Sequence, residues 1–199
     1  MTELASAIAQ AHDFRNRVGA LVSGEYADDT RSTLLVAFSD QIFEHHEAIL
    51  SLIEQGFTGS AFALVRSLIE AFFKVQWVVA CATDAQAEKV ATKHNFDFPG
   101  AEELVTAIDE KLQTDGFFLA FKKNAWKALN SYTHTGLLQL SRRFTGRRVE
   151  SRYDEAEIIE VVHVITTAIV LLGRFFAVST GRTAEAEEAE RLMEQYGDA

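Results

Sequence analysis

The segment NSYTHTG, residues 130–136, consists almost entirely of side chains that form hydrogen bonds. It follows KKNAWKAL, residues 122–129, whose composition is typical of a helix. If the helix continues, Asn130 and His134 lie four residues apart on one face. Histidine can accept or donate a proton near neutral pH. The pair therefore predicts a site for acid–base chemistry, with Asn130 as the orienting group; the alternative is a helix end that His134 merely caps.

Positive charge is concentrated around this pair. Between residues 122 and 152 there are eight basic residues and one acid, Glu150, which gives +7 in a chain whose net charge is −10. A basic segment in an acidic protein is typical of a local patch for an anionic ligand such as RNA, DNA or a nucleotide phosphate. Alternatively, its arginines pair with acidic surface on the same chain or on a partner. The basic residues are Lys122, Lys123, Lys127, Arg142, Arg143, Arg147, Arg148 and Arg152.

A second group of charges lies on an otherwise apolar stretch. Arg66, Glu70 and Lys74 follow one another at four-residue intervals within residues 61–82. On a helix they share one face, and Arg66–Glu70 has the spacing of an ion pair. Charges on an apolar helix must be paired or must line a cavity. The sequence leaves both interpretations open: an ion pair that holds the bundle in register, or a ligand site.

Metal chemistry finds little support. Glu160 and His163 have the Glu-x-x-His spacing of carboxylate-bridged di-iron bundles, but those bundles need the motif twice and the chain has it once. Cys81 is the one cysteine, so neither a cysteine zinc site nor an internal disulfide is expected. We predict no metal and no cofactor.

Composition indicates an all-α protein. The 199 residues are 48% hydrophobic and contain a single proline, Pro99, whereas strand-and-turn patterns are lacking. We predict one domain over 1–199, a bundle of six to eight helices with an acidic terminal helix at 183–199. The expected helices cover about 3–22, 31–55, 58–81, 84–93, 102–113, 117–134, 155–179 and 183–196.

The expected setting is the cytoplasm. The N-terminus lacks the basic region and apolar core of a signal peptide. The apolar stretches 61–82 and 161–178 are interrupted by charged residues, so each is interpreted as a central bundle helix and no membrane span is predicted.

A helical bundle with a polar motif late in a helix, beside a basic segment, resembles the HEPN superfamily. Those small helical domains are commonly dimeric, occur in bacterial toxin–antitoxin and anti-phage systems, and include many metal-independent ribonucleases. Their motif is an arginine, often followed directly by asparagine, and then a histidine a few residues later. Asn130 and His134 match it; Leu129 stands at the arginine position, and Lys127 precedes it by two residues. The resemblance implies that histidine assists attack by a ribose 2′-hydroxyl while a cation stabilises the phosphate.

A second resemblance spans most of the chain. The run LVRSLIEAFFKVQWV, residues 64–78, followed later by NSYTHT, looks like uncharacterised bacterial all-helical families built around Arg-Ser-x-x-Glu and a later histidine motif. It implies that Arg66, Glu70 and His134 lie together, and it implies no activity.

Two functional hypotheses follow. The first is a HEPN-like bacterial protein that binds or cleaves RNA, acting as a homodimer in the role of a toxin or defence component. The second is a non-catalytic helical protein that binds a small ligand or a protein partner. For the first, the candidate catalytic residues are His134, Asn130 and Lys127. The candidate ligand-binding residues are Arg66, Glu70, Tyr132, Arg142, Arg143, Arg147 and Arg148.

Overall fold

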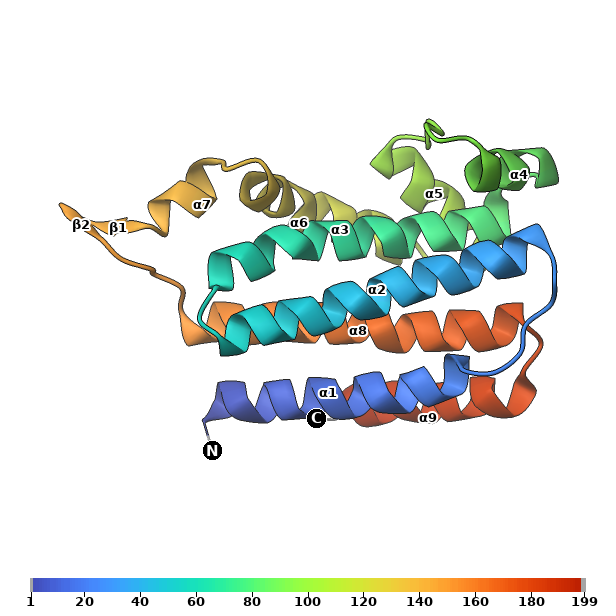
Figure 1. Cartoon of the computed structure of the whole chain (residues 1–199), viewed down its shortest axis with the longest axis horizontal. Coiled ribbons are helices and arrows are strands. Elements are labelled where there is room, and N and C mark those ends of the chain that lie inside the picture. The colour runs from blue at the N-terminus through green and yellow to red at the C-terminus, as the bar shows by residue number, and fades with distance from the viewer. Residues whose placement is uncertain (1, 198–199) are drawn as a thin grey trace.

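The computed structural model describes residues 2–197 and confirms an all-α architecture (Figure 1). These residues form nine α-helices, a π-helix η1 (Trp77–Cys81) and a small hairpin of β1 (Phe144–Thr145) and β2 (Arg148–Val149). The helices are α1 (Glu3–Val22), α2 (Thr30–Glu54), α3 (Thr58–Gln76), α4 (Asp84–Thr92), α5 (Ala101–Leu112), α6 (Phe117–Thr133), α7 (Leu137–Ser141), α8 (Glu155–Ser179) and α9 (Thr183–Gly197).

The predicted helix ends agree with the structure to within one residue at almost every boundary. Two segments differ. The last turn of the helix expected over 58–81 is the π-helix η1, and the loop expected at 145–153 begins with the hairpin β1–β2. The short α7, before that hairpin, takes the helix count one above the predicted range. These elements are too short to leave a periodic pattern in the sequence.

The long helices pack in layers (Figure 1). As predicted, α2 and α3 form an antiparallel hairpin, because only a short turn joins them. Helix α8 packs against α1, α2, α3 and α9, whereas α6 packs on α3 and α5. Gly173 allows α1 to approach α8 closely, because a Cβ there would lie 2.6 Å from Cγ1 of Val18. The segment of α7, β1 and β2 projects from one end of the bundle.

Helix α8 is the most apolar helix of the chain. It is the one described helix that is long and apolar enough to cross a membrane by length and composition alone. In its most apolar window, 56% of the residues are buried against other helices. That burial is typical of the core helix of a soluble bundle, which is apolar nearly all round because helices surround it.

Asp109 of α5 fixes the start of α6. Its carboxylate is buried and accepts hydrogen bonds from the backbone N–H groups of Phe118, at 3.0 Å, and Leu119, at 2.9 Å. The residue before α6 is Gly116, which has no side chain to cap the helix. Asp109 therefore supplies the cap from a neighbouring helix, satisfying N–H groups that have no partner within α6.

Replacing Asp109 by alanine is expected to lower the free energy of unfolding by about 1–3 kcal/mol, because two N–H groups in the first turn of α6, one buried and one partly buried, lose their acceptor. Urea denaturation followed by circular dichroism measures this. Glu110→Ala, which removes the exposed acid next in sequence, is the control and should change stability by less than about 0.5 kcal/mol. Equal effects from the two variants would contradict the capping role.

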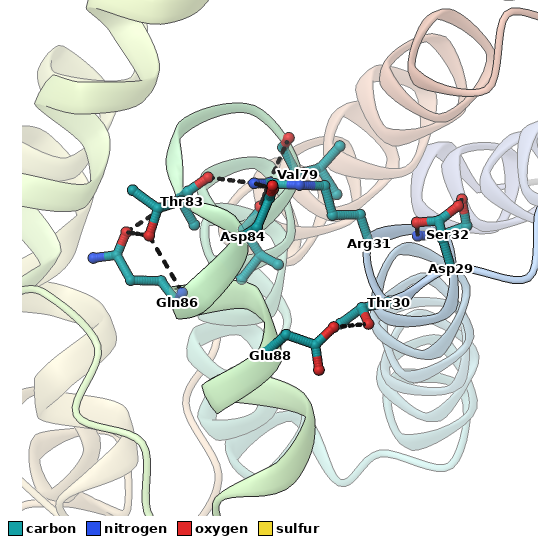
Figure 2. A network of polar contacts seen from close by, with 11 residues as sticks. Asp29, Thr30, Arg31, Ser32, Val79, Thr83, Asp84, Gln86 and Glu88 are labelled. Atoms are coloured by element: carbon teal, nitrogen blue, oxygen red, sulfur yellow. Dashed lines mark hydrogen bonds and ion pairs between the residues drawn. The ribbon is translucent and has the colours of Figure 1, made fainter.

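Arg31 holds the wide turn of η1 (Figure 2). Its Nη1 donates to the carbonyl oxygens of Val78, at 2.5 Å, and Val79, at 3.2 Å. Its Nη2 donates to the carbonyl oxygen of Ala82, at 2.5 Å, and to Asp84, at 2.9 Å. Carbonyls at a helix end lack partners within the helix. One guanidinium from α2 therefore stabilises the junction between η1 and α4.

His46 is an unpaired polar group in the core. Its exposed fraction is 0%, and neither ring nitrogen has a hydrogen-bond partner among residues 2–197. Burial lowers the pKa of His46 from 6.5 to about 3, with smaller contributions from the charges of Arg15 and His12. The folded protein therefore keeps this histidine neutral, because a buried charge without a partner is costly.

This pKa makes stability depend on pH. Between about pH 6.5 and 3 the unfolded chain binds a proton at His46 that the folded chain does not bind. The free energy of unfolding therefore falls as the pH falls through this window, with a limiting slope of about 1.4 kcal/mol per pH unit.

Below about pH 6.5, the free energy of unfolding of His46→Phe should fall less steeply with falling pH than that of the parent protein. Urea denaturation at a series of pH values measures the two slopes. Identical slopes in variant and parent would contradict a neutral, buried His46.

Candidate active site

Two polar stripes face each other where α6 crosses α3. On α3 the stripe consists of Arg66, Glu70 and Lys74, and on α6 it contains Asn130 and His134; within each stripe successive residues are four apart. Residues at this interval lie on one face of a helix. Because α6 packs directly on α3, the two stripes meet along the crossing.

Arg66 connects the two stripes. Its Nε donates to Oε1 of Glu70 at 2.7 Å. Its Nη1 donates to Oδ1 of Asn130 and lies 3.0 Å from Nε2 of His134. Its guanidinium carbon lies 5.1 Å from the centre of the Trp126 ring, within reach of a cation–π interaction. The structure thus brings together Arg66, Glu70, Asn130 and His134, and α3 supplies the arginine that the segment before His134 lacks.

The arginine determines how the His134 ring can bond. Arginine only donates hydrogen bonds, so Nε2 of His134 must be the acceptor in this pair. The neutral ring then carries its proton on Nδ1. His134 is exposed and follows the last residue of α6, where its backbone N–H donates to the Asn130 carbonyl oxygen at 3.0 Å. The ring is therefore held at one nitrogen and open to a ligand.

A cleft of about 340 Å³ adjoins Arg66. Lys74 lies in it, with Nζ 3.8 Å from Oε2 of Glu70 and 5.1 Å from the centre of the Phe98 ring. Two cations thus share one carboxylate. The Nη2 of Arg66 makes no hydrogen bond to any residue that the structure describes. The excess positive charge and the unused donors suit an anion.

Phe98 lines this cleft and belongs to an aromatic cluster. Trp77 of η1 packs against Phe96, with ring centres 6.3 Å apart, and against Phe98, at 6.0 Å. Phe96 and Phe98 meet edge to face, with ring centres 4.9 Å apart. The trio fixes the segment between α4 and α5 beside Lys74, so the cleft has a defined wall.

The other predicted site residues lie apart from this cluster. Lys127 is exposed on α6 and makes no described contact with Asn130 or His134. Tyr132 faces the opposite side of α6, where it packs on Phe62 and Tyr153, with ring centres 5.1 and 6.4 Å away. Burial raises the pKa of the Tyr132 phenol.

The basic segment divides into paired and free charges. Arg142 forms an ion pair with Glu157, and Lys122 pairs with Glu102 at 2.7 Å. These two charges are paired within the chain. Arg143 packs beside Tyr153 over Gly59, where a Cβ would lie 2.4 Å from Nη2 of Arg143. The remaining charges have no ion-pair partner within residues 2–197 and are all exposed. They are Lys123 and Lys127 on α6, Arg147 and Arg148 on the projecting segment, and Arg152 just after it.

Sequence reasoning missed Trp126, the third member of the α6 stripe. The spacing could have revealed it, because Trp126 precedes Asn130 by four residues and so shares its face of the helix.

His163 lies away from this cluster, against Tyr196 of α9, with ring centres 6.2 Å apart. Among residues 2–197, no group of three or more histidine, cysteine or acidic side chains is arranged to hold a metal ion.

This geometry defines a class of protein. It is an all-α bundle in which an arginine, a glutamate, an asparagine and a histidine are joined across two helices. Residues 40–199 match a family of unknown function, DUF6988, and the chain belongs to that family. The matched region contains both stripes. Searches of the curated proteins and of the solved structures found no match.

The Arg66 contact predicts the tautomer of His134. In its neutral form the ring should carry its proton on Nδ1, because Nε2 accepts from Arg66. Nitrogen NMR of the labelled ring measures the tautomer. In Arg66→Met the preference should disappear, whereas Arg147→Met, which removes an exposed arginine elsewhere, should leave it unchanged. A ring protonated at Nε2 in the parent protein would contradict the described contact.

Proposed function

We propose that this protein is a HEPN-like bacterial protein that binds RNA and cleaves it without a metal, in the manner of a toxin or anti-phage defence component. The observation that carries the proposal is the placement of Arg66 against Asn130 and His134. The resemblance to HEPN ribonucleases requires an arginine, an asparagine and a histidine. This chain assembles the three from α3 and α6 instead of from one continuous motif.

The chemistry would be attack by a ribose 2′-hydroxyl on the adjacent phosphate. His134 takes the proton from the 2′-hydroxyl, the O2′–P bond forms and the P–O5′ bond breaks, which leaves a 2′,3′-cyclic phosphate and a 5′-alkoxide. The alkoxide takes a proton from water to become the 5′-hydroxyl, and the hydroxide so formed takes the proton from His134. Arg66 stabilises the charge that develops on the phosphate oxygens. In this step Arg66 turns from the ring to the phosphate, which frees Nε2 to accept the proton.

The surrounding residues would support this role. Asn130 holds the guanidinium, and Glu70 fixes it from the other side, at 2.7 Å. These two hydrogen bonds keep the guanidinium in place when its contact with the His134 ring is exchanged for the phosphate. The exposed arginines 147, 148 and 152 are near neighbours in sequence, on and just after the projecting segment. They would contribute attraction for phosphates at longer range, which weakens with salt.

A second function, binding without cleavage, is favoured by one observation. Both Nε and Nη1 of Arg66 already donate hydrogen bonds within the protein, to Glu70 and Asn130. If the arginine does not leave the histidine, the cluster is a structural lock and the cleft beside Lys74 is a site for a small anion. Cleavage and binding assays on the same variants separate these functions.

The test uses purified protein and a mixed RNA substrate, with and without EDTA. Cleavage should persist in EDTA and yield 2′,3′-cyclic phosphate ends. His134→Ala and Arg66→Ala should each reduce the rate by about 10²–10⁴-fold, the usual contribution of an acid–base group or of one charge-stabilising group. His94→Ala, which changes an exposed histidine outside the cluster, is the matched control and should cleave like the parent.

Absence of cleavage by the parent protein would contradict the enzymatic proposal. Filter binding of labelled RNA and calorimetry with inorganic phosphate would then test the second function. In that case Lys74→Ala should weaken phosphate binding, whereas Lys93→Ala, which removes an exposed lysine outside the cleft, should leave it unchanged.

A further inference from the structure

An apolar trench runs between α6 and α8. Both helices pack on α3, which forms the floor. The trench consists of three adjoining cavities of about 250, 180 and 840 Å³. The first two share Phe121 and Val164, and the second and third share Phe117, Phe118 and Leu171. The cavities are therefore one continuous feature, which extends from Glu157 to Ser179 along α8.

The α8 wall has the pattern of a helix–helix contact. Its trench-lining apolar residues alternate between intervals of three and four, which is the spacing of a coiled-coil seam. They are Val161, Val164, Ala168, Leu171, Phe175 and Val178. The other faces of α8 pack on α1, α2, α3 and α9. Val178 is nevertheless 56% exposed, and Phe117 across the trench is 51% exposed. One face of an otherwise buried helix thus lacks a helical partner within the described chain.

The trench carries opposite charges at its two ends. Glu160 lies at the end where α6 finishes, and Lys111 lies at the end where α6 begins. Both side chains are exposed, and neither has an ion-pair partner in the described part of the chain. The neighbouring Arg174 already pairs with Glu190, at 3.1 Å. A two-fold axis across the middle of the trench would place each acidic end opposite the basic end of another copy.

We propose that the α6–α8 trench is the interface of a two-fold homodimer, in which Glu160 of each protomer pairs with the partner subunit's Lys111. Self-complementary surfaces of this kind generate closed dimers, the commonest oligomer. The contact would run for about 30 Å along α8, given the rise of an α-helix. It would bury the apolar residues that the monomer leaves exposed.

The candidate active site stays open in this dimer. Asn130 lies nine residues after Phe121, which is two and a half helical turns, so the two side chains are on opposite flanks of α6. The trench and the arginine–histidine cluster are therefore separate surfaces. The dimer does not depend on RNA cleavage, and failure of one proposal leaves the other standing.

Charge exchange across the interface tests the proposal by sedimentation equilibrium. Glu160→Lys and Lys111→Glu should each raise the dissociation constant of the dimer at least about tenfold, because like charges then face each other. An equimolar mixture of the two variants should restore the parental affinity, since opposite charges meet again in the mixed dimer. Glu44→Lys, the same change on exposed α2 surface, should leave the dissociation constant unchanged.

A second variant probes the apolar contact. Leu171→Asp should give monomers, and a parental melting curve would show that it remains folded. A parent that is monomeric at all accessible concentrations would overturn the proposal, as would a dimer insensitive to Leu171→Asp and to both charge exchanges. A monomer that binds a fluorescent fatty acid, displaced by Leu171→Asp, would also overturn it and assign the trench to a lipid.

Discussion

The crossing of α6 over α3 is the constraint on which the rest of the structure depends. The Arg66 guanidinium is mostly covered, with 20% of its side chain exposed, and a charge in that setting needs partners. Glu70 supplies one from the same helix, and Asn130 and His134 supply two from α6. At the other end of α6, Asp109 satisfies the backbone of the first turn. The helix is thus fixed at both ends, and its two flanks become the candidate site and the trench.

The sequence was sufficient to predict most of the helices, because caps and glycines mark their ends. Asp29 accepts from Ser32 at the start of α2, and Thr83 and Gln86 form a capping box at the start of α4. These signals are local, so a single sequence contains them. The π-turn at η1 is different. It depends on Arg31, which is distant in sequence from the carbonyls it binds and leaves no mark in the local pattern.

The candidate site was predictable in its parts but not in its assembly. The spacing of Arg66 and Glu70 indicated an ion pair, and the spacing of Asn130 and His134 indicated a shared helix face. Contact between these pairs depends on which flank of α6 faces α3, and that is a tertiary property. Lys127 was chosen because it precedes His134 in sequence, yet an arginine on another helix is the cation in contact. The same limit applied to Arg142, whose pairing with Glu157 joins two separate elements.

The π-helix also has a consequence for how this fold tolerates changes in length. A π-turn is in effect a single residue inserted into an α-helix, and it rotates everything that follows it relative to the stripe of Arg66, Glu70 and Lys74. Trp77 itself stays in phase with α3, because its backbone N–H donates to the carbonyl oxygen of Phe73. The rotation instead sets the direction of the chain beyond η1, which returns to pack Phe96 and Phe98 on Trp77. A deletion of one residue within 78–81 would return the chain to α-helical phase and turn the segment of Phe96 and Phe98 away from Trp77. The length of one turn thus positions Phe98, which lines the cleft beside Lys74.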